Sequence, residues 1–214
     1  MRNVSVLPDI DTGFLDLHLL KDGLLVPQKA EVYDNIDPVA LRVWCLKRGF
    51  YSLPTIEAVD FLKDMIGPAS AIEVGAGHGA WARALGIKAT DSYLQHRPEI
   101  RALYEGMGQP VVDYPPDVLK YDAHAAIKRF KPRFILGAWI TQKWEEGDAE
   151  GNMFGPDERK FLQGGRTYIH IGNEQTHRHK KIMRYLKAQY HSPALFSRSD
   201  RQDLNVIWVF HKGG

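Results

Sequence analysis

Three glycines at alternate positions mark the stretch of this chain with the clearest capacity for chemistry. Residues 71–79 read Ala-Ile-Glu-Val-Gly-Ala-Gly-His-Gly, an apolar run that holds one acid and ends in a glycine-rich turn. Glycine lacks a Cβ, so the turn can adopt positive φ and admit a ligand close to the backbone. The residues from Ala80 onward favour a helix, whose first N–H groups would point at that ligand. The pattern therefore predicts a strand, a turn and a helix that together bind a nucleotide.

Acidic residues end the next two predicted strands. The segments Gly86–Asp91 and Pro116–Asp122 are typical of short parallel strands, and each ends in an aspartate. Ligands of open α/β sheets bind beyond the carboxyl ends of the strands, so these acids and Glu73 should face one crevice. A carboxylate at Asp91 can accept hydrogen bonds from both hydroxyls of a ribose. Asp122 could accept from an adenine amino group, or it could instead cap the helix that follows it.

The glycine spacing fits two kinds of nucleotide site. Gly75-Ala-Gly77-His-Gly79-Ala80 matches the dinucleotide fingerprint in its alanine-ended form, and it also matches the pattern acid-x-Gly-x-Gly-x-Gly. Two features favour the second pattern. Glu73 lies two residues before the first glycine, where a dinucleotide fold usually keeps an apolar residue, and Asp122 offers a second polar contact suited to adenine.

At these motifs the chain resembles the Rossmann-like S-adenosylmethionine-dependent methyltransferases. Glu73–Gly79 is similar to their first motif and Ala89–Ser92 to their second. Tyr121–Ala123 is similar to their third motif, and Phe134–Trp139 to their fourth strand, whose end faces the methyl group. The resemblance covers about residues 50–212 of the chain.

The resemblance implies that the chain is an enzyme, a methyltransferase whose cofactor is S-adenosylmethionine. Asp91 would bind the ribose, Asp122 would contact the adenine, and Tyr51 would close over the cofactor. The methyl donor is already activated, so positioning can supply most of the catalysis, and no catalytic side chain or metal ion is assigned. The residues that the resemblance places at the cofactor are Glu73, Gly75, Ala76, Gly77, Gly79, Asp91, Ser92, Asp122, Ala123 and Trp139.

The methyl acceptor is expected to be a small molecule rather than a nucleic acid. Enzymes that methylate amino groups of nucleic acids carry an Asp/Asn-Pro-Pro-Tyr/Phe motif after the fourth strand, where this chain has Gly137–Gln142. A Pro-Cys nucleophile is also missing, since the single cysteine, Cys45, precedes the sheet. The formal net charge of +2 is too small to indicate nucleic-acid binding by itself. The sequence leaves the identity of the acceptor and the oligomeric state open.

Two other functions remain compatible with the same residues. The glycine turn could belong to an oxidoreductase that uses a nicotinamide dinucleotide. The chain could also keep the cofactor-binding fold without catalysing a reaction. Thermal stabilisation by S-adenosylmethionine, by NADH or by neither would distinguish the three cases.

The alternation of strands and helices predicts an α/β fold with a doubly wound, mostly parallel sheet of seven strands. Residues 51–214 would form this Rossmann-like cofactor-binding domain, and residues 1–50 an N-terminal extension with a helical cap. We expect Ala194–Ser197 and Asn205–His211 to form an antiparallel hairpin at the C-terminal edge of the sheet. Thr176–Gln189 is expected to be a helix with an exposed basic face.

Punctuating residues predict the ends of two helices before the sheet. Asp37-Pro38 is a plausible start for a helix that runs to Arg48, where Gly49 would stop it. Pro54 would start a second helix, and Gly67-Pro68 would end it.

Two further segments have less specific patterns. Thr141–Gly155 is polar and rich in glycine, which is typical of a mobile substrate loop. His170 lies on a predicted buried strand, where a histidine is more often a satisfied core residue than a general base.

Composition places the chain among soluble globular proteins of one α/β domain with an appendage. It has 214 residues, of which 44% are hydrophobic and 25% are charged. No apolar run approaches the roughly 20 residues that cross a bilayer, and Asp9, Asp11 and Asp16 interrupt any secretory signal. A single cysteine is typical of a reducing compartment, so we expect a cytoplasmic protein that does not contact membranes.

Overall fold

The computed structural model describes residues 10–106, 108, 110–148 and 151–213 of the chain. A seven-stranded sheet forms its centre, with the strands in the order β6-β5-β4-β7-β8-β11-β9. All strands run parallel except β11, which is antiparallel to both of its neighbours, β8 and β9. The strands of this sheet are β4 (Ala71–Val74), β5 (Lys88–Asp91), β6 (Val118–Lys120), β7 (Phe134–Ala138), β8 (Thr167–Asn173), β9 (Leu186–His191) and β11 (Asn205–His211).

Helices cover both faces of the sheet, as in a doubly wound fold. One face packs Ile72, Ile135 and Trp208 against α7, and the other packs Leu136 and Ile169 against α4 and α5. This is the Rossmann-like α/β architecture that the strand–helix alternation predicted. The helices after the N-terminal region are α4 (Ile56–Ile66), α5 (Ala80–Leu85), α6 (Pro98–Gly106), α7 (Ala123–Phe130) and α8 (Glu174–His177), with four 3-10 helices at Leu94–His96, Glu158–Leu162, Lys181–Tyr185 and Gln202–Leu204.

The C-terminal edge differs from the predicted hairpin. Phe196–Ser197 forms β10, which leaves the main sheet and pairs with β3 (Ser52–Leu53), so β11 pairs instead with β9. The predicted helix over Thr176–Gln189 is also wrong, because α8 ends at His177 and β9 begins at Leu186. β9 is an edge strand whose side chains are almost all exposed, so its sequence lacks the apolar alternation that would reveal a strand.

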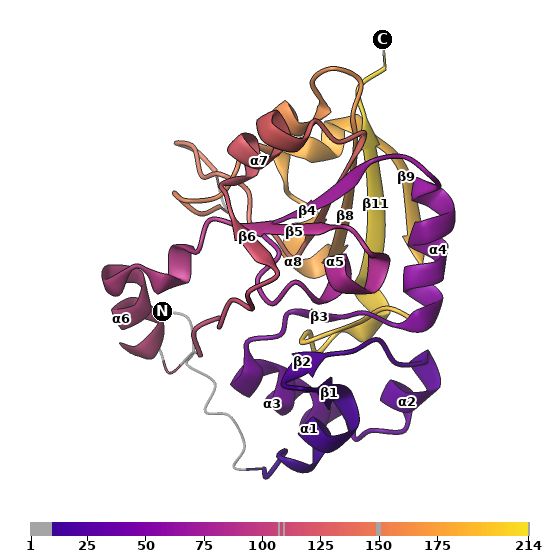
Figure 1. The fold of residues 1–214 in the computed structure, drawn as a ribbon, viewed down its shortest axis with the longest axis vertical. Coiled ribbons are helices and arrows are strands. Elements are labelled where there is room, and N and C mark those ends of the chain that lie inside the picture. Colours follow the sequence, from indigo (N-terminus) through magenta and orange to yellow (C-terminus); the bar gives the residue numbers. More distant parts are fainter. Residues whose placement is uncertain (1–9, 107, 109, 149–150, 214) are drawn as a thin grey trace.

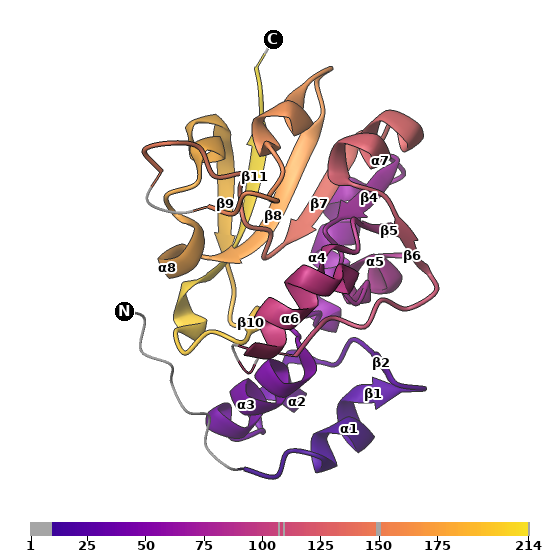
Figure 2. The same ribbon diagram turned by 90° about the vertical axis from the view of Figure 1, so that its left-hand side faces the viewer.

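The N-terminal region folds as a small helical unit at one end of the sheet (Figure 1). Its core joins Leu15, Tyr33 and Trp44 to Ala80 at the start of α5 and to Phe196 of β10. Figure 2 shows this unit at the end of the molecule opposite the C-terminus. Its elements are α1 (Phe14–Leu19), β1 (Leu20–Lys21), β2 (Leu24–Leu25), α2 (Ala30–Asp34) and α3 (Pro38–Arg48).

The helix ends follow the predicted capping chemistry closely. Asp37 accepts a hydrogen bond from the Ala40 N–H at 2.8 Å, and α3 ends at Gly49, whose φ is 71°. Thr55 rather than Pro54 starts α4, because its hydroxyl caps the Ala58 N–H at 3.1 Å. Within the described residues, no helix is both long and apolar enough to cross a membrane.

Candidate functional site

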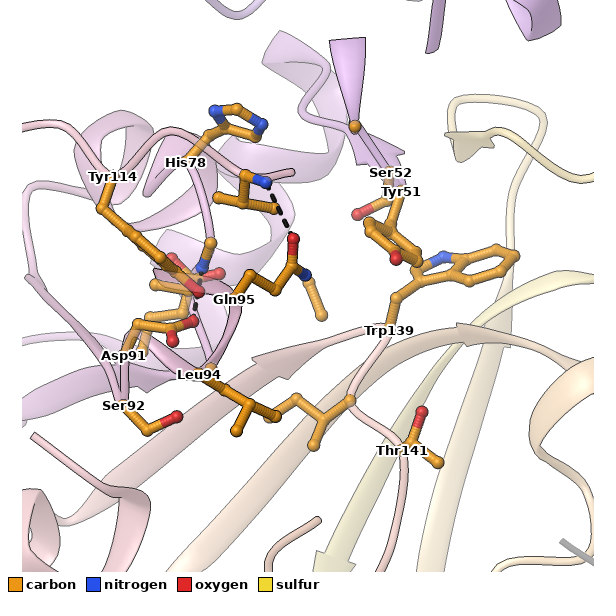
Figure 3. A pocket seen from close by; sticks show the side chains of 18 of the residues that line it. Tyr51, Ser52, His78, Asp91, Ser92, Leu94, Gln95, Tyr114, Trp139 and Thr141 are labelled. Carbon is orange, nitrogen blue, oxygen red and sulfur yellow. Dashed lines mark hydrogen bonds between the residues drawn. The ribbon is translucent and has the colours of Figure 1, made fainter. Parts of the chain in front are cut away.

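A cavity of about 230 Å³ opens at the carboxyl ends of β4, β5 and β7 (Figure 3). The chain order of the sheet reverses at β4, which has β5 on one side and β7 on the other. In open α/β sheets, this reversal leaves a crevice in which ligands bind. The lining comes from residues 49–52 beside α3, the glycine turn, the segments after β5 and β7, and residues 152–156.

The glycine turn has the backbone conformation that its sequence predicted. Gly75, Gly77 and Gly79 all have positive φ, at 61°, 53° and 67°. Gly75, Ala76 and Gly77 line the cavity, whereas Gly79 does not. A Cβ on Gly79 would lie only 2.8 Å from Cγ2 of Val118, so this glycine lets α5 pack closely on the sheet.

Asp91 at the end of β5 fastens the glycine turn while it faces the cavity. Its Oδ2 accepts a hydrogen bond from the Gly77 N–H at 2.9 Å, and its Oδ1 accepts one from the Tyr93 N–H at 2.9 Å. Burial raises the pKa of Asp91, and these two N–H donors limit the rise. Each carboxylate oxygen keeps lone pairs for further donors such as ligand hydroxyls. The adjacent Ser92 also lines the cavity.

Glu73 lies at the floor of the cavity and supports α5. Its Oε2 accepts a hydrogen bond from the Ala82 N–H at 2.8 Å, in the first turn of the helix. The residue before that helix is Gly79, which has no side chain to cap it, so Glu73 takes over this role from β4. The side chain is 1% exposed, and burial raises its pKa to about 8.

Asp122 and Ala123 lie outside the cavity lining. Asp122 caps α7, since its Oδ1 accepts hydrogen bonds from the His124 and Ala125 N–H groups, both at 3.0 Å. The capping alternative from the sequence is therefore the role that this side chain has in the structure. The adenine contact predicted for these two residues receives no support from their positions.

Several lining residues carry no sequence signal; the 3-10 helix after β5 and the loop before β6 bring them to the cavity. Leu94, Gln95 and Tyr114 lie on the same side as Asp91 (Figure 3). The Gln95 Oε1 accepts a hydrogen bond from the Val112 N–H at 2.8 Å, which holds the segment before β6 against the cavity. Tyr114 stacks on the Tyr93 ring with centroids 4.1 Å apart.

Trp139, predicted to face the methyl group, lies on the opposite side of the cavity beside Tyr51 (Figure 3). The two ring centroids are 6.2 Å apart. Trp139 has a φ of 57°, which is strained for a bulky side chain, and its backbone N–H is held by the Ile171 carbonyl at 2.8 Å. Its indole Nε1 is buried and has no hydrogen-bond partner among the described residues.

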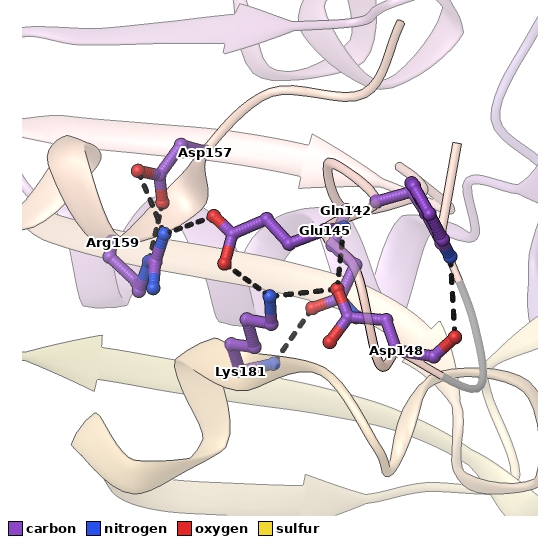
Figure 4. A network of polar contacts seen from close by, with 7 residues as sticks. Gln142, Glu145, Asp148, Asp157, Arg159 and Lys181 are labelled. Atoms are coloured by element: carbon purple, nitrogen blue, oxygen red, sulfur yellow. Dashed lines mark hydrogen bonds and ion pairs between the residues drawn. The ribbon is translucent and has the colours of Figure 1, made fainter. Parts of the chain in front are cut away.

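The polar loop after β7 supplies one wall of the cavity through Thr141, Asn152 and Phe154. Its sequence suggested a mobile segment. Residues 149–150 lie outside the described part of the chain, and ion pairs fasten Glu145 and Asp148 to the body of the protein (Figure 4). Lys181 binds Glu145 and Asp148, and Arg159 binds the other Glu145 oxygen at 2.7 Å.

A buried lysine holds the start of the same loop. The Lys180 Nζ donates to the Ile140 carbonyl at 2.7 Å and pairs with Glu158 Oε1 at 2.6 Å. Lys180 therefore holds the backbone directly after Trp139 in place. Ile140 itself packs in the core on the face of the sheet that α7 covers.

The two central histidines belong to the core rather than to the cavity. His170 is fully buried, its Nδ1 lies 2.9 Å from the Tyr168 hydroxyl, and burial lowers its pKa well below the ordinary value. His177, expected on an exposed helical face, is buried under the Trp139 ring at a centroid distance of 5.1 Å. Burial lowers its pKa to about 3, so its ring is neutral near pH 7.

Within the described part of the chain, no group of three or more His, Cys, Asp or Glu side chains could hold a metal ion. No protein-family model matches the chain, and no curated protein matches it. The function must therefore be inferred from the geometry of the cavity.

Proposed function

We propose that this chain is a methyltransferase that binds S-adenosylmethionine in the cavity at the ends of β4, β5 and β7. The observation that carries the proposal is the bond between the Asp91 carboxylate and the Gly77 N–H. It joins the acid after the second strand of the sheet to the glycine turn after the first. This pairing supports the proposal, because a carboxylate that could accept from ribose hydroxyls lies beside backbone that a nucleoside could approach.

The residues present fit such a cofactor. Asp91 would hold the ribose hydroxyls, and the backbone at Gly75 and Gly77 would lie along the ligand without a Cβ in the way. Leu94 and Tyr114 line the cavity beside Asp91 and offer apolar surface for a base. We therefore assign the base contact to this pair rather than to Asp122.

The cavity is smaller than most ligand sites, which span about 300–1,000 Å³. Binding of a nucleoside-sized ligand therefore requires movement of side chains at its wall. Phe154 is 44% exposed, so its side chain can move at low cost.

The opposite half of the cavity would receive the methyl acceptor. Tyr51, Tyr104 and Trp139 line it, and these side chains would orient a small acceptor and exclude water. Bound S-adenosylmethionine supplies a methyl group activated by its sulfonium. The chain contributes the alignment of the acceptor with that group, which is the main requirement of an in-line displacement.

A nicotinamide dinucleotide is the second candidate, because the glycine spacing also fits it. The strand order argues against it. When the strands of the sheet are numbered along the chain, a dinucleotide-binding sheet has the order 3-2-1-4-5-6. In the same numbering this sheet has the order 3-2-1-4-5-7-6, because the antiparallel β11 lies between β8 and β9. A cavity of about 230 Å³ is also a poor match for two linked nucleotides.

A thermal-shift comparison tests the proposal. S-adenosylmethionine and S-adenosylhomocysteine, each at about 100 times its dissociation constant, should add about 2.7 kcal/mol to the free energy of unfolding. NADH should leave the melting temperature unchanged. Stabilisation by NADH alone would favour the oxidoreductase, and no shift with any of the three would refute both.

A further inference from the structure

Four cations form a row across one end of the sheet. Arg133 precedes β7, Arg166 precedes β8, Lys212 follows β11, and Lys187 is the second residue of β9. The strand register sets these ends side by side, since Phe134 pairs with Thr167, Thr167 with His211, and Phe210 with Leu186. Neighbouring strands lie about 4.8 Å apart, and each of these four strands carries one cation at this end.

This row lies at the end of the molecule opposite the cavity. The cavity adjoins the carboxyl ends of the parallel strands, whereas Arg133 and Arg166 precede their amino ends. The C-terminus marks the same end in Figures 1 and 2, far from the N-terminal unit that borders the cavity. Any ligand of the row is therefore separate from the proposed cofactor.

Within the part of the chain that the structure describes, no acidic side chain pairs with the row of Arg133, Arg166, Lys187 and Lys212. The two arginines each donate to a backbone carbonyl, of Gly165 and Gln163 respectively, which leaves other N–H groups of each fork for a ligand. Like charges gathered at one end of the molecule attract an anionic partner.

A cleft of about 690 Å³ beside the row extends the positive surface. Lys160, Arg184 and His211 line it together with Arg133 and Lys212, and its lining contains no acidic residue. We call the row and the cleft cations, namely Arg133, Lys160, Arg166, Arg184, Lys187 and Lys212, the basic rim.

One aromatic ring lies within this cleft. Tyr185 lines it, and the Arg184 guanidinium lies 4.9 Å from the centre of the Tyr185 ring. Cations that follow a phosphate backbone, combined with an aromatic face on which a base can stack, are the usual features of sites for single-stranded nucleic acid. Arginine forks also match phosphate geometry closely.

We propose that the basic rim binds single-stranded nucleic acid, with its cations on the phosphates and Tyr185 against a base. The net charge of +2 conceals this surface, because acids elsewhere in the chain balance the cations gathered at one end. The proposal concerns binding at the rim. The methyl acceptor remains a small molecule at the other end of the sheet.

Fluorescence anisotropy with a labelled 20-nucleotide oligo(dT) tests the proposal across a salt series. The variant Arg166→Glu/Lys212→Glu should bind at least tenfold more weakly than the wild type at 50 mM salt. Loss of two phosphate contacts should make the negative slope of log K against log salt shallower by about 1.4. Lys21→Glu/Lys29→Glu is the matched control, because it makes the same charge change at exposed lysines of the N-terminal region and should stay within twofold.

A second variant addresses the aromatic contact and a second readout addresses folding. Tyr185→Ala should weaken oligo(dT) binding severalfold and leave the salt slope unchanged, since it removes stacking and no charge. The thermal shift of every variant with S-adenosylhomocysteine should equal that of the wild type. If the charge reversal unfolds the protein, Arg166→Gln/Lys212→Gln takes its place. This variant should also bind oligo(dT) more weakly and with a shallower salt dependence.

Three results would overturn the proposal. The first is no binding of oligo(dT) to the wild type at 50 mM salt, and the second is equal weakening by the rim and control variants. The third is binding of another anion, in one of two forms. Either poly-glutamate of equal charge displaces the labelled oligonucleotide as effectively as unlabelled oligo(dT) does, or the protein binds vesicles of anionic lipid in preference to oligo(dT). Either form of the third result would assign the rim to a different class of anion.

Discussion

The glycines of the turn and the acids beside them have separate structural roles, although they form one pattern in the sequence. Gly75 and Gly77 expose backbone to the cavity, Gly79 lets α5 approach the sheet, and Glu73 caps that helix. Asp91 links the turn to β5. Substitutions within the motif should therefore have different consequences for folding and for ligand binding.

Gly79→Ala and Gly77→Ala form a matched pair that separates backbone strain from crowding. Both residues have positive φ, which costs a non-glycine residue roughly 1 kcal/mol. A Cβ at Gly79 would also overlap Val118 at 2.8 Å, whereas at Gly77 the nearest side-chain atom is 3.8 Å away. Urea unfolding should show a larger loss for Gly79→Ala, by about 1–3 kcal/mol. Equal losses would mean that close packing of α5 is not what Gly79 provides.

The buried Glu73 carboxyl should make stability depend on pH. Its pKa rises from an ordinary 4.5 to about 8 on folding, so between these values the folded state binds more protons than the unfolded state. The free energy of unfolding should therefore fall as pH rises from about 4.5 to 8, by about 1.4 kcal/mol for each unit of pKa shift.

Glu73→Gln tests this because it keeps the shape and removes the proton equilibrium. Relative to the wild type, the variant should gain stability as the pH of a urea titration is raised from 5 to 8. Glu31→Gln, at an exposed glutamate, is the control and should follow the wild-type profile. Parallel profiles for Glu73→Gln and the wild type would show that the carboxyl does not titrate in this range.

At the scale of elements, one wall of the cavity is formed by a loop that ion pairs hold in place. The segment from Thr141 to Pro156 borders the cavity, and Lys181 fastens it through Glu145 and Asp148. Removing that cation should free the loop without disturbing the sheet.

Hydrogen exchange of the amides at 143–148 should be severalfold faster in Lys181→Gln than in the wild type. Raising the salt should accelerate the same amides in the wild type, because screening weakens exposed ion pairs. Lys143→Gln, within the loop but without an ion pair among the described residues, should exchange at the wild-type rate. Unchanged exchange in Lys181→Gln would mean that backbone hydrogen bonds alone order this loop.

Across the whole molecule, the sequence predicted the central sheet better than its edge. The buried parallel strand β7 is a continuous apolar run, and β4 is one that only Glu73 interrupts, so the sequence reveals both directly. The exposed β9 has no such pattern, and its place is decided by pairing with β11. Phe196–Ser197 does not form the predicted hairpin because it pairs instead with β3, the short strand between α3 and α4.

The sequence predicted the cavity-lining residues that strand ends and turns position, and it missed those that come from segments without a motif. Gly75, Gly77, Asp91 and Trp139 line the cavity as expected, since strand ends and turns fix them. Asp122 lies two residues after β6 and its side chain caps α7, and the sequence alone fitted both this role and the adenine contact. Tyr104 reaches the cavity from α6 and Tyr114 from the loop before β6, and neither position has a sequence signature.

Calorimetric titration with S-adenosylhomocysteine is the most direct measurement of the central claim. The wild type and Asp60→Ala, a change at an exposed aspartate of α4, should bind it with one site per chain. Asp91→Ala should lose at least tenfold in affinity, because the ribose loses its acceptor and the Gly77 N–H its partner. Undiminished affinity in Asp91→Ala, or no heat of binding in the wild type, would contradict the account.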